Sequence, residues 1–234
     1  MSIPQSPLSA RLAQLRERIE LACRQAGREP GSVALLPVSK TFPADVLAQA
    51  LDLGLHRLGE NKLQEIRDKQ AQLAGRDVQW VMIGHLQTNK AKDAARLAAE
   101  VQSLDRLSLA QELDRRLQLE QRSLDVLIQV KTSPEESKFG LPPEDLPAFM
   151  QALRSLDTLR VRGLMTMAVN SPDPQAVRAC FRQLRQWRDR LQELGHEQVQ
   201  RLSMGMSGDF ELAIQEGSTE VRVGSALFGA RDYA

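Results

Sequence analysis

The stretch VALLPVSKTFPADVLAQALDLG, residues 33–54, shows how the chain is built. Its first seven residues form a continuous apolar run, which is typical of a strand buried on both faces. Pro43 then opens a helical pattern and Gly54 closes it, because proline is favoured in the first turn of a helix and glycine just after its last turn. The stretch is therefore predicted to be one strand followed by one helix.

The same unit recurs along the whole sequence. Further strand candidates, each followed by a helical or turn pattern, are HRLGEN (56–61), VQWVMIGH (78–85), EVQSLD (100–105), LDVLIQVK (124–131), LRVRGLMTM (159–167), VQRLSMGMS (199–207) and TEVRVGSALFG (219–229). Alternating strands and helices with buried strands imply a parallel sheet. Eight strands in 234 residues favour an α/β fold of the (β/α)8 TIM type, which takes about 250 residues.

An open, doubly wound sheet is the alternative fold. It is weakened because SKTFP follows the first strand, where a dinucleotide-binding sheet has a glycine-rich turn. Residues 9–26 repeat apolar positions at helical spacing and predict one extra amphipathic helix before the barrel. We expect a single domain over residues 1–234, with this helix and its lead-in at 1–30 and the barrel at 31–230.

Composition excludes several classes of function. The chain has 31 basic and 30 acidic residues, for a net charge of +1, so nothing favours a nucleic-acid or membrane-surface partner. The N-terminus lacks the apolar core of a signal peptide, and no apolar run is long enough to span a bilayer. Cys23 and Cys180 lie within helical patterns and are interpreted as core thiols. We expect a cytoplasmic protein.

Lys40 is the first candidate for chemistry. It directly follows the first predicted strand, and active sites of such barrels lie at the C-terminal ends of the strands. A lysine against apolar walls can keep its amine neutral and nucleophilic, for example toward a carbonyl carbon. The alternative is a solvated lysine on the rim of the barrel, and Lys40 alone does not decide between them.

Two turns of small residues follow the last two predicted strands. They contain Ser207 with Gly208, and Gly224 with Ser225. Phosphate sites in these barrels are frequently built from the loops after strands seven and eight. The alternative is that Ser207 and Asp209 only cap a helix, and Asp209 would disfavour a phosphate unless its side chain turned away.

Arg222 lies two residues before the second of these turns. The period of two places it on the same face as Glu220 and Gly224, so it could donate to an anion or to a ring nitrogen. The alternative is a weak rim ion pair with Glu220. Four methionines on the predicted strands are interpreted as core residues, and the charge-rich helix RQLRQWRDRLQEL (182–194) as a solvated outer face.

A lysine after the first strand and a phosphate cradle after the last two point to pyridoxal 5′-phosphate (PLP). The chain also closely resembles the pyridoxal phosphate homeostasis proteins, which are single-domain relatives of the alanine racemase barrel. The matching stretches are VSKTFP, LGENKLQE, WVMIGHLQTNK, SKFGL, RGLMTM, LSMGMSGDFELAI and STEVRVGSALFGARDY. They cover nearly the whole chain in order.

The resemblance implies a role for each candidate. Lys40 would hold PLP as an internal aldimine, and Arg222 would face the pyridine nitrogen. The other implied cofactor-binding residues are Ser207, Gly224 and Ser225 at the phosphate, with Asn61 and Met206 lining the cofactor. Lys138 of SKFG would take part in handling PLP. Lys131 stands where the family usually has asparagine, which leaves the loop contacts at that point open.

The function implied is binding of PLP for its homeostasis, by buffering or delivery, with little or no catalysis. PLP-dependent apoenzymes are the expected acceptors, and a monomer is the expected state. The alternative is an amino-acid racemase, whose second base is a tyrosine from a further domain. Here Tyr233 is the only tyrosine, and the sequence stops just after the last predicted strand. An aldolase that uses Lys40 on a phosphorylated sugar is a further alternative.

Overall fold

The computed structural model describes residues 6–135 and 138–229. Its strands alternate with helices, as predicted. In chain order the elements are α1 (Pro7–Gln25), β1 (Ala34–Pro37), α2 (Ala44–Asp52), β2 (Arg57–Glu60), α3 (Leu63–Gln72), β3 (Gln79–Met82), η1 (Thr88–Lys90), α4 (Ala91–Leu97), β4 (Glu100–Leu104), α5 (Leu107–Leu119), β5 (Leu124–Gln129), η2 (Pro143–Asp145), α6 (Leu146–Leu153), β6 (Leu159–Met165), α7 (Pro174–Glu193), β7 (Arg201–Ser203), α8 (Phe210–Gln215), β8 (Glu220–Val223) and α9 (Ser225–Phe228).

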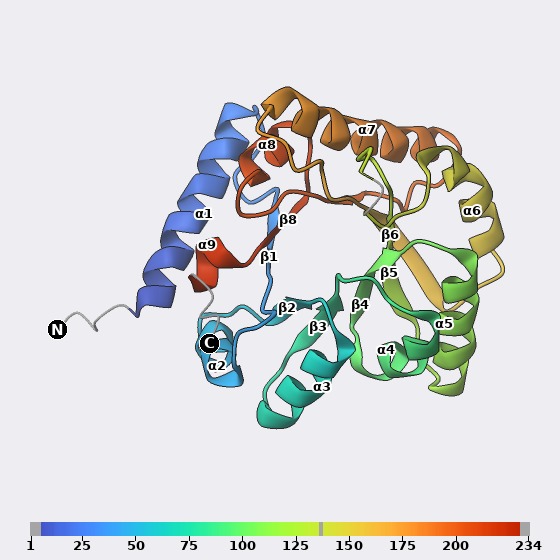
Figure 1. Ribbon diagram of the computed structural model, residues 1–234, viewed down its shortest axis with the longest axis horizontal. Coiled ribbons are helices and arrows are strands. Elements are labelled where there is room, and N and C mark those ends of the chain that lie inside the picture. The colour runs from blue at the N-terminus through green and yellow to red at the C-terminus, as the bar shows by residue number, and fades with distance from the viewer. Residues whose placement is uncertain (1–5, 136–137, 230–234) are drawn as a thin grey trace.

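The described strands form one parallel sheet of eight, in the order β1-β8-β7-β6-β5-β4-β3-β2. The two ends of this order meet just beyond β1. There Val38 pairs with Gly59 of β2 in a parallel bridge, and the N–H of Ser39 donates to the Gly59 carbonyl at 2.9 Å. The sheet thereby closes into a barrel with the helices outside it (Figure 1). The predicted (β/α)8 fold is confirmed.

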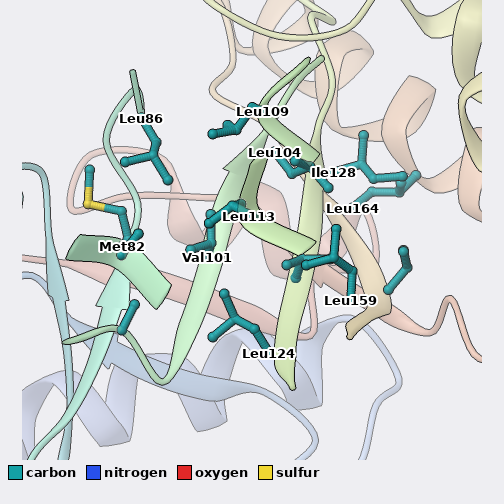
Figure 2. Packing of buried hydrophobic residues seen from close by; sticks show 14 of the residues in the cluster. Met82, Leu86, Val101, Leu104, Leu109, Leu113, Leu124, Ile128, Leu159 and Leu164 are labelled. Carbon is teal, nitrogen blue, oxygen red and sulfur yellow. The ribbon is translucent and has the colours of Figure 1, made fainter. Parts of the chain in front are cut away.

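The main hydrophobic core lies between the sheet and the surrounding helices. Figure 2 shows side chains from four successive strands, Met82, Val101, Ile128 and Leu164, together with Leu113 of α5. All five are at most 2% exposed. Each such side chain contributes roughly 1.5–3 kcal/mol through its removal from water. This outer core holds the strand ends in register, and the strand ends carry the candidate site.

The extra N-terminal helix is confirmed as α1, which packs along α8 and α9 (Figure 1). It starts at Pro7, where the Ser6 side chain accepts a hydrogen bond from the N–H of Ser9 at 3.2 Å. Its buried stripe includes Leu12, Leu15 and Cys23, in agreement with the predicted apolar spacing. A second hydrophobic cluster thus joins α1 to the strand–helix unit at the end of the barrel.

A layer of ion pairs fills the lower part of the barrel interior. Arg57 of β2 and Arg201 of β7 both donate to the carboxylates of Glu100 on β4 and Glu220 on β8, at 2.8–3.0 Å. These residues begin strands that are mostly not neighbours, so their contacts cross the barrel. The interior at this end is therefore filled by paired charges.

The last strand is shorter than predicted. β8 ends at Val223, and Gly224 turns the chain into the short helix α9. The apolar residues Leu227 and Phe228, which extended the predicted strand to residue 229, are buried in the cluster with α1. Because these residues are buried on a short helix, they form an apolar run that resembles the continuation of β8.

The sequence indicated a solvated outer face for the long helix α7. The structure shows that α7 also makes ion pairs with a buried carboxylate. Arg178, Arg182 and Arg185 converge on the buried carboxylate of Glu216, just after α8, at 3.1–3.8 Å. These pairs attach α7 to the chain between α8 and β8. Neither α7 nor any other helix in the described part of the chain is both long and apolar enough to span a membrane.

Candidate functional site

The C-terminal ends of the strands surround a cavity of about 440 Å³. Its lining residues come from the ends of β1, β2, β3, β5, β6, β7 and β8. All of the site residues predicted from the sequence are among them: Lys40, Asn61, Met206, Ser207, Arg222, Gly224 and Ser225. The structure therefore brings these residues together at one cavity.

Lys40 lies on the wall of this cavity, with Val38 and Ile83 as apolar neighbours in the lining. The residues on either side of it are held by carboxylates. The buried hydroxyl of Ser39 donates to Glu60 Oε1 at 2.7 Å, and the N–H of Thr41 donates to Glu65 Oε2 at 2.9 Å. Lys40 therefore stands at the cavity on a tightly held segment, and not on the outer rim of the barrel.

Arg222 lies deeper in the same cavity and is 4% exposed. Its guanidinium donates to Ser203 Oγ at 2.9 Å and to the Thr166 carbonyl at 2.8 Å. Burial lowers its pKa to about 10, although the charges of Glu220 and Asp209 raise it. Because a pKa of about 10 lies well above neutral pH, Arg222 is positively charged there and acts only as a donor.

A chain of hydrogen bonds connects Arg222 to the ion pairs in the lower barrel. The hydroxyl of Ser203 donates to Gln102 Oε1 at 2.7 Å, and Gln102 Nε2 donates to Glu220 Oε1 at 2.5 Å and to Glu100 Oε1 at 2.7 Å. Glu220 thus receives hydrogen bonds from Gln102 and from arginines of other strands. A rim pair between Glu220 and Arg222 is therefore wrong.

The two turns of small residues line the same cavity. Ser207 and Ser225 approach each other there, since the N–H of Ala226 donates to Ser207 Oγ at 3.4 Å. Within the described residues, no hydrogen-bond partner is found for the N–H groups of Ser207 and Ser225. Backbone N–H groups of this kind, in a turn and at the start of a helix, can bind an anion.

Asp209 does not point into these turns. Its carboxylate accepts the N–H of Met206 at 2.5 Å and closes the loop after β7. Asp209 is the N-cap residue of α8, as the alternative interpretation had it, but its side chain makes no capping hydrogen bond to the helix. Burial raises its pKa, against the opposing effects of the Met206 N–H and of the charge of Arg222. The side chain that could have repelled a phosphate is thus used within the loop.

Asn61 and Met206 both line the cavity. The backbone of Asn61 lies so close to Gly84 that a Cβ at residue 84 would be 2.3 Å from the Asn61 carbonyl oxygen. Met206 is 40% exposed, whereas Met165 and Met204 are buried. The prediction that all four strand methionines pack in the core is therefore correct for Met165 and Met204 and wrong for Met206, and Met167 is half-buried in the cavity lining.

The sequence did not identify the aromatic pair that lines the cavity. The rings of His85 and Phe139 stack with centroids 3.9 Å apart and planes at 18°. His85 was noted only as a strand-end residue, and Phe139 belongs to a loop that returns to the barrel. The Gln129 side chain holds this loop by donating to the Phe139 carbonyl at 2.9 Å. Contact between residues so far apart in the sequence leaves no local pattern.

Two lysines discussed above lie outside the cavity lining. Lys138 pairs with Glu135 at 2.8 Å and also donates to the Ala168 carbonyl. Lys131 is half-buried at the start of the same loop. Tyr233, the only tyrosine of the sequence, is outside the described residues.

The barrel and its cavity define a class of protein. The chain matches the family described as alanine racemase, N-terminal domain, over residues 10–232, and it belongs to that family. A pyridoxal phosphate homeostasis protein of Pseudomonas aeruginosa is 45% identical over 228 residues, which cover 97% of each chain. The homeostasis protein of Aquifex aeolicus is 43% identical over 95% of this chain and 98% of its own.

A solved structure agrees with these relatives. PipY of Synechococcus elongatus, described as having PLP bound, has a TM-score of 0.85 and 37% identity, covering 95% of this chain and 100% of that chain. Within the alanine racemase class, the chain therefore belongs to the pyridoxal phosphate homeostasis proteins. The resemblance found in the sequence is confirmed.

Proposed function

We propose that this chain binds PLP in the cavity at the C-terminal ends of its strands and acts in PLP homeostasis. The observation that carries the proposal is that one cavity of about 440 Å³ is lined by Lys40, Arg222 and the two small-residue turns. Each of these three parts matches a different part of PLP. The names of the relatives and the PLP bound to PipY support the same function.

The donor set fits the groups of the cofactor. The N–H groups and hydroxyls around Ser207 and Ser225 would take the phosphate, since none of the described residues that line the cavity carries a carboxylate. Arg222 would donate to the pyridine nitrogen, and Asn61 and Met206 would lie beside the ring. Gly224 packs closely on the chain just beyond β1, because a Cβ at this position would lie 3.2 Å from the Val38 carbonyl oxygen.

Lys40 would hold the cofactor covalently. Its neutral amine would attack the aldehyde carbon, a C=N bond would form, and the aldehyde oxygen would leave as water. Only the neutral amine has the electron pair that this attack uses. This bond would tie the cofactor to the segment just after β1, while the turns after β7 and β8 would hold its phosphate.

Arg222 bears on whether the protein is a catalyst. When bound, PLP supplies an electron sink for carbanions, which is strongest when the ring nitrogen carries a proton. An arginine cannot accept a hydrogen bond, so Arg222 would favour an unprotonated ring nitrogen. Its charge at neutral pH supports a holder of PLP with little or no catalysis, rather than a racemase.

The cavity mouth supports buffering or delivery. Met206 and Phe139 line the cavity and are 40% and 52% exposed, so solvent reaches the site past them. A cofactor held by a reversible C=N bond at an open mouth can leave by hydrolysis. PLP-dependent apoenzymes as acceptors, a monomeric state, a cytoplasmic location and a single-domain organisation of residues 1–234 belong to this proposal.

The test is a titration of the cofactor-free protein with PLP, followed by absorption spectroscopy. We expect a new visible band in the wild type and none in Lys40→Ala, with circular dichroism unchanged. Lys92→Ala is the matched control, because Lys92 is exposed on α4 and does not line this cavity. An unchanged band in Lys40→Ala would remove Lys40 from the proposal. Rapid racemisation of alanine by the loaded wild type would favour the racemase instead.

A further inference from the structure

A buried lysine lies behind the segment that carries Lys40. Lys69 of α3 is 7% exposed, and its ammonium donates to Glu60 Oε1 at 2.6 Å, to Glu65 Oε2 at 2.9 Å and to the Ser39 carbonyl at 2.9 Å. An ammonium has three donors, so every one of them is used. We call Lys69, Glu60 and Glu65 the Lys69 cluster. None of its members lines the cavity.

The Lys69 cluster makes hydrogen bonds to the backbone on both sides of Lys40. Before Lys40, the carbonyl of Ser39 accepts from Lys69, and the hydroxyl of Ser39 donates to Glu60. After Lys40, the N–H of Thr41 donates to Glu65. One buried ammonium therefore connects, through its two carboxylates, the residues on either side of the proposed cofactor lysine.

The backbone held in this way is in an unusual conformation. Thr41 has a φ of 69°, in the left-handed region that β-branched residues rarely adopt. Such a conformation persists only where the surroundings impose it, and it is concentrated at functional sites. The hydrogen bond from the Thr41 N–H to Glu65 is one such constraint.

A role limited to stability accounts poorly for the cluster. Buried ion pairs recover little more than the cost of removing their charges from water. In this case Glu60 is fully buried, its Oε2 has no hydrogen-bond partner among the described residues, and burial raises its pKa despite the hydrogen bonds from Lys69 and Ser39. An apolar packing of the same volume would avoid this cost.

We infer that the Lys69 cluster positions Lys40, by fixing the backbone on both sides of it so that its amine is held at the cavity for bond formation. The inference rests on the proposed function, in which Lys40 bonds to PLP. Lys69, Glu60 and Glu65 are positioning residues, because they act on Lys40 only through Ser39 and Thr41.

The test separates bond formation from binding. Lys69→Met removes the ammonium and keeps a side chain of similar length. The rate of covalent capture of PLP is measured by borohydride quenching and mass spectrometry. Affinity for pyridoxine 5′-phosphate, which has no aldehyde, is measured by calorimetry. We expect capture to slow at least about tenfold, since small displacements of a reacting group have large effects on rate. Affinity for the analogue is expected to stay within about twofold, because the turns and Arg222 are untouched.

Lys92→Met is the control, because Lys92 is exposed on α4; it should match the wild type in both measurements. Capture by Lys69→Met at the wild-type rate, or equal losses of capture and analogue affinity, would overturn the inference. A wild type that captures no PLP at Lys40 would instead overturn the proposed function.

Two variants of Glu65 test the backbone contact even if Lys69→Met does not fold. Both remove the charge that pairs with Lys69, but only Glu65→Gln keeps an oxygen that can accept the N–H of Thr41. We expect Glu65→Gln to capture PLP faster than Glu65→Ala by at least about fivefold. Equal capture rates in the two variants would show that the hydrogen bond to Thr41 does not position Lys40.

Discussion

Replacing Arg222 by methionine should separate its cost to folding from its value in binding. Burial, partly opposed by the charges of Glu220 and Asp209, lowers the pKa of Arg222 to about 10, which corresponds to a net cost of roughly 3 kcal/mol to the charged form. Arg222→Met removes this penalty. It also leaves the Thr166 carbonyl oxygen and the Ser203 hydroxyl oxygen without the hydrogen bonds that Arg222 donates. This loss should destabilise the folded protein by about 1–3 kcal/mol. The two effects nearly cancel, so the free energy of unfolding should change by less than about 2 kcal/mol.

PLP binding should respond differently. Losing a charge-assisted hydrogen bond to the ring nitrogen costs about 1.5–3 kcal/mol, so the affinity of Arg222→Met for PLP should fall about 10- to 150-fold. Its absorption band should also change, because the donor at the ring nitrogen is gone. Urea denaturation of the cofactor-free protein measures the first quantity, and a PLP titration followed by absorption measures the second.

Arg201 on the neighbouring strand is a matched control. Although burial lowers the pKa of Arg201, its ion pairs with Glu100 and Glu220 raise it above its ordinary value. The folded protein therefore stabilises the charged form of Arg201. Arg201→Met should destabilise the protein by about 3 kcal/mol and leave PLP affinity within about twofold. The reasoning would be refuted if Arg222→Met lost more than about 4 kcal/mol of stability while its affinity and spectrum for PLP stayed unchanged.

Three further predictions follow from the packing and charges. Gly84→Ala and Gly163→Ala put a Cβ 2.3 Å from the Asn61 carbonyl oxygen and 2.0 Å from a carbonyl oxygen of β7, so urea denaturation should show both losing about 1–3 kcal/mol. Only Gly84→Ala should also weaken PLP binding in a titration, and equal affinities in the two would contradict the contact with Asn61. Although burial raises the pKa of Glu220, nearby arginines and a glutamine lower it below its ordinary value, so its stabilising contribution should be lost as the pH falls below about 4. Urea midpoints should therefore decline less steeply between pH 5 and 3 in Glu220→Gln than in the wild type, and identical slopes would count against this assignment. Trp80 is 2% exposed and its indole N–H has no partner among the described residues, so Trp80→Phe should stay within about 1 kcal/mol of the wild type, and a loss above about 3 kcal/mol would reveal a partner.

Much of the fold could be predicted from the sequence because each strand and helix has a local sequence pattern. A buried strand followed by a helix is an apolar run followed by a 3.6-residue period, and this pattern repeats eight times. Lys40 and the turns at Ser207 and Gly224 could be chosen because they directly follow strands, and strand ends of a barrel gather at one face. The error at β8 also has a local cause, since the apolar residues of α9 resemble a continued strand.

The remaining features depend on contacts that no local pattern encodes. Glu220 and Arg222 are two residues apart on one strand, yet Glu220 pairs with Arg57 and Arg201 across the barrel and Arg222 donates to Ser203. Which residues share an interior layer depends on how the closed sheet is staggered. Lys69 could not be predicted as a site residue for a similar reason. A single lysine in a helical pattern is typical of the solvated face, and its contact with Ser39 is made only in the folded chain.

The central claim is that Lys40 bonds to PLP, and one measurement tests it most directly. The protein is incubated with PLP, reduced with borohydride, digested and mapped by mass spectrometry. The account predicts a single major adduct on Lys40, at close to one per chain, and none above background on Lys131 or Lys138. A major adduct on another lysine, or no adduct at saturating PLP, would contradict the account.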